Sequence, residues 1–167
     1  GTAKFLPSKT HKTFTTIGTP HYMAPEVILG KGYGLFADLW SVGICLFEFM
    51  CGALPFGEEA EDPQEVCEEI LSKPLKIPAW LKDPQTRKII AQLINKLPDI
   101  RLGSSYAALK ANAWFEGFDW DLLMEKEIPA PYIPPSKKLI SEAEIQKMTT
   151  LGYKVVDEIK KEQKKKQ

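Results

Sequence analysis

The sequence has no excess of charge of either sign, no long apolar run and no recognisable leader. Its 22 lysines and arginines balance 22 acidic residues, so the chain as a whole gives no electrostatic reason to bind nucleic acid. The longest strongly apolar stretch, residues 39–50, is too short to cross a bilayer and contains Glu48. No signal peptide is visible, because Lys4 and Lys9 interrupt the opening residues. These absences predict a cytoplasmic protein without nucleic-acid partners.

Cysteine and histidine are also scarce. Cys45, Cys51 and Cys67 are odd in number and lie within helical patterns, which favours three reduced thiols over disulfides or metal ligands. Neither His11 nor His21 has a cysteine or histidine partner at metal-ligand spacing. We therefore expect no metal site.

Hydrophobic residues make up 44% of the chain and charged residues 26%, as in ordinary globular domains. Residues 36–50 are apolar on nearly every face, which predicts a helix that is buried on all sides. No strand hairpin stands out, so the predicted fold class is mainly α.

Helix-start patterns support this assignment. Asp62 and Asp83 each precede a proline, an arrangement that caps a helix and places proline in its first turn. The predicted helices cover residues 63–71, 84–97, 106–111 and 141–161. The second of these has an apolar stripe that includes Leu97, and the last opens with a capping box formed by Ser141 and Glu144.

Residues 18–26 read GTPHYMAPE and match the end of the protein-kinase activation segment. Three further kinase features follow in order, at the spacing of a kinase C-terminal lobe: Asp-Leu-Trp-Ser-Val-Gly from Asp38, Leu-Pro-Phe from Leu54 and Arg-Leu-Gly from Arg101. The aromatic run from Trp114 is similar to the exit of AGC-group kinases into their C-terminal tail. Residues 1–135 therefore resemble the AGC group of Ser/Thr protein kinases. Residues 27–34, 51–57 and 97–103 look most like cyclic-GMP-dependent kinases of alveolate protists.

The resemblance implies a protein-kinase-like fold, C-terminal (large) lobe only, from the activation segment onward. Residues 1–26 would be the activation segment and substrate-positioning loop. Residues 27–118 would be the helical lobe. Residues 119–167 would be a C-terminal tail with a proline-rich linker and a terminal helix.

The resemblance also implies a floor for the peptide substrate. Gly18, Pro20 and Tyr22 would shape that floor, and Thr19 would face the catalytic aspartate of a complete kinase. All four lie within the GTPHYMAPE motif.

Thr15 aligns with the activation-loop phosphothreonine. A phosphate there would add close to two negative charges and order the loop by recruiting basic partners. The chain lacks the usual arginine partner, and Lys12 is a weak substitute. Thr13 and Thr16 are nearby competitors for the same assignment.

Three charged residues would serve the architecture. Glu26 and Arg101 would form a bidentate ion pair that anchors the substrate loop, because the carboxylate and guanidinium forks match. Asp38 opens an otherwise apolar helix, where an unpaired buried carboxylate is costly. In the resembling kinases such an aspartate holds the catalytic loop. The alternative is an acid that complements the helix dipole.

Glu48 is the second acid of the same helix. In basophilic AGC kinases this carboxylate receives a substrate arginine, and the alternative is a salt bridge to an internal lysine or arginine. Ten residues separate Asp38 from Glu48, so they face different directions and are not a catalytic carboxylate pair. His21 stands where many relatives have a glutamate that reads a second arginine, which leaves that distal preference open.

The printed residues lack a glycine-rich loop, a strand lysine and a His-Arg-Asp catalytic loop. Gly1 would be the glycine of the magnesium-binding motif. The resemblance thus implies no catalytic residue and no cofactor in these 167 residues, which we expect to be inactive alone. The complete enzyme would use MgATP, bind cyclic GMP on regulatory domains outside this chain, pair with a kinase N-lobe and act on basic peptides. The alternative is a non-catalytic kinase-like interaction module.

Residues 137–167 carry nine lysines against five acids. This excess suggests a third possibility, an adaptor that contacts anionic lipid or nucleic acid. The favoured interpretation is a solvated helix end whose lysines complement the dipole. We therefore do not expect membrane contact.

Overall fold

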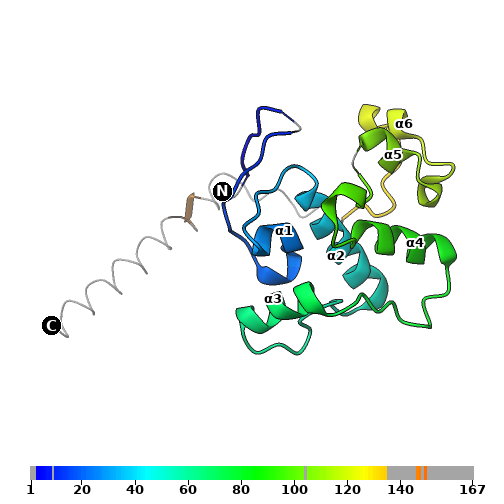
Figure 1. Ribbon diagram of the computed structural model, residues 1–167. Helices are drawn as coiled ribbons and strands as arrows, with labels where there is room; N and C mark the ends of the chain where they lie inside the picture. The colour runs from blue at the N-terminus through cyan, green and yellow to red at the C-terminus, as the bar shows by residue number, and fades with distance from the viewer. Residues whose placement is uncertain (1–2, 9, 104, 135–145, 148, 150–167) are drawn as a thin grey trace. The chain divides into compact units, whose positions relative to one another are not determined.

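The computed structural model describes residues 3–8, 10–103, 105–134, 146, 147 and 149, and over these residues it is mainly helical (Figure 1). The predicted mainly α fold class is confirmed. Gly1, the terminal helix expected at 141–161 with its capping box, and the lysine-rich end lie outside the described residues, apart from isolated positions. The chain separates into two units, residues 1–120 and residues 121–167, and each is described by itself.

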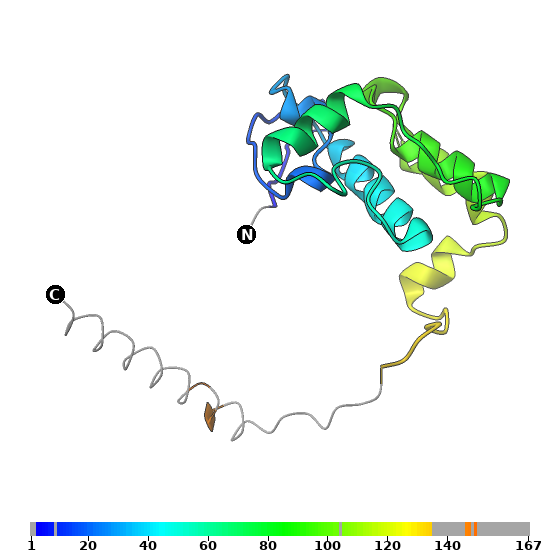
Figure 2. The same cartoon turned by 90° about the horizontal axis from the view of Figure 1, so that it is seen from below.

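The first unit contains short 3-10 helices (η) and α-helices in the order η1 (Pro20–Tyr22), α1 (Pro25–Ile28), α2 (Ala37–Cys51), α3 (Pro63–Ser72), α4 (Pro84–Leu93), η2 (Pro98–Ile100), α5 (Tyr106–Lys110) and η3 (Ala113–Phe115). Helix α6 (Trp120–Glu125) begins at the boundary and lies mostly in the second unit. Helix α2 packs against α4 and η1, and both views show α4 running beside it (Figures 1 and 2).

The predicted caps of α3 and α4 are confirmed. The Asp62 carboxylate accepts hydrogen bonds from the amides of Gln64 and Glu65 at 2.8 and 2.9 Å. The Asp83 carboxylate accepts one from the Thr86 amide at 2.7 Å. These bonds satisfy amides that would otherwise have no partner in the first helical turn, so each aspartate fixes where its helix begins.

The predicted end of α4 was wrong. The helix ends at Leu93, and Leu97 is 62% exposed instead of continuing the buried stripe. The Asn95 side chain accepts a hydrogen bond from the Leu97 amide at 2.9 Å, a local turn that competes with further helix. Pro98 follows at once and disfavours helical backbone at the residue before it.

The prediction that α2 is buried on all sides was also wrong. Trp40, Ile44 and Phe47 are buried in the core, whereas Val42 is 51% exposed and Phe49 is 82% exposed. The reason is that the described part of the chain covers one face of α2 and leaves the opposite face open. Cys45, Cys51 and Cys67 form no disulfide among the described residues.

Glycine permits the close approach of α2 and α4. A Cβ atom on Gly43 would lie 2.8 Å from the Leu93 Cβ atom, closer than nonbonded carbons pack. None of the helices among the described residues is long and apolar enough to cross a bilayer.

Candidate functional site

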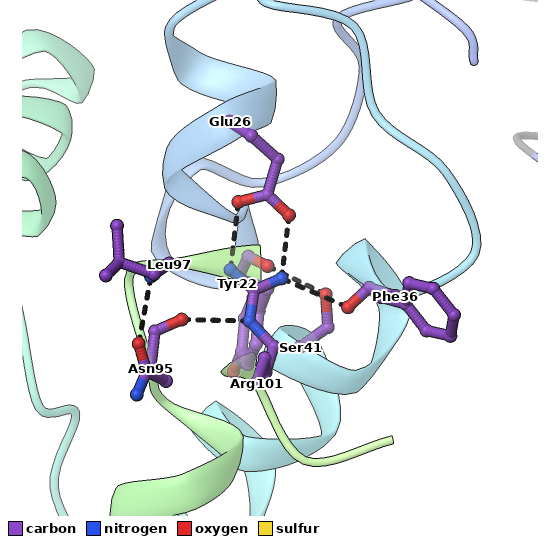
Figure 3. A network of polar contacts seen from close by, with 7 residues as sticks. All are labelled: Tyr22, Glu26, Phe36, Ser41, Asn95, Leu97 and Arg101. Carbon is purple, nitrogen blue, oxygen red and sulfur yellow. Dashed lines mark hydrogen bonds and ion pairs between the residues drawn. The ribbon is translucent and has the colours of Figure 1, made fainter. Parts of the chain in front are cut away.

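An ion pair between Glu26 and Arg101 joins segments 75 residues apart (Figure 3). The Arg101 Nη1 atom donates to Glu26 Oε1 at 2.7 Å, and Nη2 donates to Oε2 at 2.9 Å. Arg101 is 1% exposed and Glu26 is 8% exposed. The bidentate pair expected from the resemblance is therefore present. Both side chains are buried, where two well-aligned hydrogen bonds are needed to offset the loss of water.

The remaining donors of Arg101 tie two more segments to the same point. Its Nε atom donates to the carbonyl of Asn95 at 2.9 Å, and Nη1 also donates to the carbonyl of Phe36 at 3.1 Å (Figure 3). The guanidinium carbon lies 5.3 Å from the centre of the Trp40 ring. A lysine could not make this set of contacts, because its single ammonium lacks the planar fork.

Gly103 completes this Arg-Leu-Gly motif. Its φ angle is +104°, a conformation that residues with a Cβ atom rarely adopt. A Cβ atom there would also lie 1.8 Å from Leu39 Cδ1. The glycine therefore lets the motif close against α2.

The motif around η1 rests on α2. The Ser41 hydroxyl donates to the carbonyl of Tyr22 at 2.8 Å (Figure 3). Pro20 opens η1 and fixes its first φ angle, while Gly18, two residues earlier, has a φ angle of +119°. Together these features set the path of residues 18–22 over the helix.

Glu48 has a partner that neither sequence interpretation anticipated. The Tyr22 hydroxyl donates to Glu48 Oε2 at 2.9 Å, and this bond, followed by desolvation and the negative charge of Glu48, raises the pKa of Tyr22 above its ordinary value. No lysine or arginine among the described residues forms an ion pair with Glu48, so the internal salt bridge is not found there. The half-buried carboxylate thus has acceptor capacity left for a cation from outside.

A cavity of about 470 Å³ lies between the first residues of the chain and the start of α2. Its lining includes Lys4, Thr19, Asp38 and Ser41. Asp38 is exposed in the first turn of α2, which corrects the expectation of a buried carboxylate. Its position fits an acid at the positive end of a helix and also leaves it facing the same cavity as Thr19.

The three candidate threonines differ in accessibility. Thr13 is 6% exposed, whereas Thr15 and Thr16 are exposed. The Lys4 Nζ atom donates to Thr13 Oγ1 at 2.8 Å, and Thr13 Oγ1 lies 3.4 Å from Thr15 Oγ1. Lys4 is therefore a cation next to Thr15 that the sequence interpretation missed, because only the fold brings it near.

His21 does not take part in a metal cluster. Its Nε2 atom lies within hydrogen-bonding distance of the Gly57 carbonyl, at 3.2 Å. Over the part of the chain that the structure describes, no group of three or more metal-ligating side chains is found. The site therefore consists of hydrogen bonds, one buried ion pair and one acid open to an external cation.

Comparison with known proteins places these features in context. The family model described as "Protein kinase domain" matches residues 1–115. The cGMP-dependent protein kinases of Eimeria tenella and Toxoplasma gondii are each 45% identical over 136 residues, which cover 80% of this chain and 14% of each relative. A cAMP-dependent protein kinase catalytic subunit of Arthrobotrys oligospora is 38% identical over 138 residues, which cover 80% of this chain and 26% of that protein. The chain thus spans a small part of the length of the curated relatives that it matches.

Proposed function

Because this chain belongs to the protein kinase family, we propose that it supplies the substrate floor and the activation segment of a Ser/Thr protein kinase. The predicted resemblance to AGC-group kinases, and to cyclic-GMP-dependent kinases of alveolate protists in particular, is confirmed. The observation that carries the proposal is the anchored floor. Tyr22 is held by Ser41 and Glu48 of α2, and the adjoining motif is fixed by the Glu26–Arg101 pair.

In this proposal the complete enzyme transfers the γ-phosphoryl group of MgATP to serine or threonine in basic substrates. The similarity to cGMP-dependent protein kinases favours cyclic GMP as its regulator. The cytoplasm remains the predicted location. Gly18, Thr19 and Pro20 would lie under the acceptor residue, with Asp38 holding the catalytic loop. MgATP and the phosphoryl chemistry would depend on residues outside these 167.

The test compares the complete kinase with the 167-residue chain in one phosphotransfer assay. With MgATP and a serine peptide that contains arginine, the complete kinase should transfer phosphate, and the isolated chain should neither transfer phosphate nor bind MgATP in calorimetry. An inactive complete kinase would favour the interaction module instead. Micromolar binding of MgATP by the isolated chain would overturn the assignment of the nucleotide site to other residues.

Thr15 is predicted to be the activating phosphosite. Its hydroxyl is exposed, and two hydrogen bonds link it through Thr13 to Lys4, so a phosphate on Thr15 would find a cation nearby. Mass spectrometry of active complete kinase should place the phosphate on Thr15.

Two variants sharpen this test. Thr15→Val should lower the activity strongly, while the exposed neighbour provides a matched control, Thr16→Val, that should change it little. Full activity of the Thr15→Val enzyme would contradict the assignment.

A further inference from the structure

Residues 31–34, in the middle of the loop between α1 and α2, pair with the activation segment. The Thr13 amide donates to the carbonyl of Tyr33 at 2.9 Å, and the Tyr33 amide donates to the carbonyl of Thr13 at 2.9 Å. This reciprocal pair is an isolated antiparallel bridge, formed outside any strand. It fixes the backbone of the activation segment two residues before Thr15.

Side chains extend the pairing to the next two residues. The Phe14 ring lies against Gly32, where a Cβ atom would be 2.7 Å from Phe14 Cε1, and Gly32 has a φ angle of +76°. The Tyr33 hydroxyl donates a hydrogen bond to the carbonyl of Thr15. The loop thus touches three consecutive residues of the segment, Thr13 through its backbone, Phe14 through its ring and Thr15 through its carbonyl.

None of these contacts uses the Thr15 side chain or a charge on it. The Thr15 hydroxyl stays exposed while its carbonyl is held. A phosphate would therefore not create this geometry but would add charge-assisted contacts to a segment already in position.

We infer that residues 31–34 form a clamp that positions the activation segment before phosphorylation, with Tyr33 as its positioning residue. The regulatory meaning of the clamp rests on the proposed function, since it concerns the activity of a kinase whose Thr15 is unmodified. The clamp and the phosphate act on the same residues. Loss of the clamp should therefore matter more without the phosphate than with it.

Hydrogen exchange of the complete kinase tests the clamp without reference to activity. Tyr33→Phe removes one hydrogen bond and should speed exchange of the Thr13 and Tyr33 amides by about threefold to tenfold, with α4 unchanged. Tyr106→Phe on exposed α5 is the control. Unchanged exchange at Thr13, or equal acceleration in α4, would overturn the inference.

Two glycines offer a second, matched comparison. Gly32→Ala strains a positive φ angle and displaces Phe14, whereas Gly30→Ala strains a φ angle of +62° with nothing within 4 Å of the new Cβ atom. Of the two variants, only Gly32→Ala should accelerate hydrogen exchange at the amides of residues 13–15. Equal acceleration by both variants would mean that backbone strain, rather than the Phe14 contact, controls the segment.

Measurements of kinase activity test whether the clamp matters more when Thr15 is unphosphorylated. In the unphosphorylated Thr15→Val kinase, Tyr33→Phe should lower kcat/KM about fivefold, and in the phosphorylated enzyme by less than about twofold. Equal losses in both forms would overturn the regulatory role. If the exchange changes appear as expected but no form transfers phosphate, the clamp stands and the proposed kinase function fails.

Discussion

Replacing Arg101 with alanine is expected to lower the free energy of unfolding by about 3–5 kcal/mol, because it leaves the buried Glu26 carboxylate without a counterion. The variant also removes the guanidinium partner of two partly buried carbonyls, those of Asn95 and Phe36. Urea unfolding of both proteins gives the difference. Arg101→Lys should lose less than Arg101→Ala, because it keeps the charge but not the fork.

A surface ion pair provides the control. Lys73 Nζ lies 2.6 Å from Glu69 Oε1, but the lysine side chain is 61% exposed, so Lys73→Ala should cost less than about 1 kcal/mol. A loss below about 0.5 kcal/mol for Arg101→Ala would show that the pair contributes no more than a solvated one. In that case Arg101 would not anchor the substrate loop.

The features that the sequence predicted well are local ones. Asp62 and Asp83 cap helices through amides two or three residues away. The Asp-Pro dipeptide is therefore enough to predict where each helix begins. The end of α4 was missed although its cause is also local. The apolar stripe continues in the sequence to Leu97, but the turn formed by Asn95 before Pro98 ends the helix first.

Of the contacts between distant parts of the sequence, one was predicted and two were missed. The Glu26–Arg101 pair was predicted only through the family resemblance, because nothing in the spacing of residues 75 apart indicates contact. The bond from Tyr22 to Glu48 and the contact of Lys4 with Thr13 were missed. Each contact depends on how the fold brings two separate segments of the chain together, and no periodicity in the sequence encodes that.

The exposed face of α2 shows why the prediction of burial on all sides was wrong. An all-round apolar pattern predicts burial on all sides only if the neighbours on every side are part of the chain. Here the described residues cover Trp40 and Phe47 and leave Val42 and Phe49 open. The apolar pattern shows that the helix is suited to burial on every side, whereas the described residues cover only one side of it.

Glu48→Gln in the complete kinase is predicted to lower kcat/KM for peptides with arginine upstream of the acceptor by about 30-fold, or about 2 kcal/mol. The acid has no ion-pair partner among the described residues, and its Oε2 atom already orients toward the Tyr22 hydroxyl. A substrate guanidinium could bind both carboxylate oxygens, which the amide of glutamine cannot reproduce. We place the loss at the lower end of such effects because Glu48 is half-buried. Steady-state kinetics measure it.

Tyr22→Phe separates the carboxylate from its orientation. It removes the hydroxyl that donates to Glu48 at 2.9 Å but keeps the ring and the charge. The arginine preference should therefore weaken only severalfold. If Tyr22→Phe abolished the preference as fully as Glu48→Gln, the hydroxyl rather than the carboxylate would be the recognition group.

The most direct measurement of the central claim is a double-mutant cycle on kcat/KM, with wild-type and Glu48→Gln complete kinase on peptides with arginine or alanine upstream of the acceptor serine. If these residues form the substrate floor of a basophilic kinase, the variant should lose about 30-fold on the arginine peptide and little on the alanine peptide. Equal losses on both peptides would make Glu48 a structural residue and would contradict its assignment to substrate arginine.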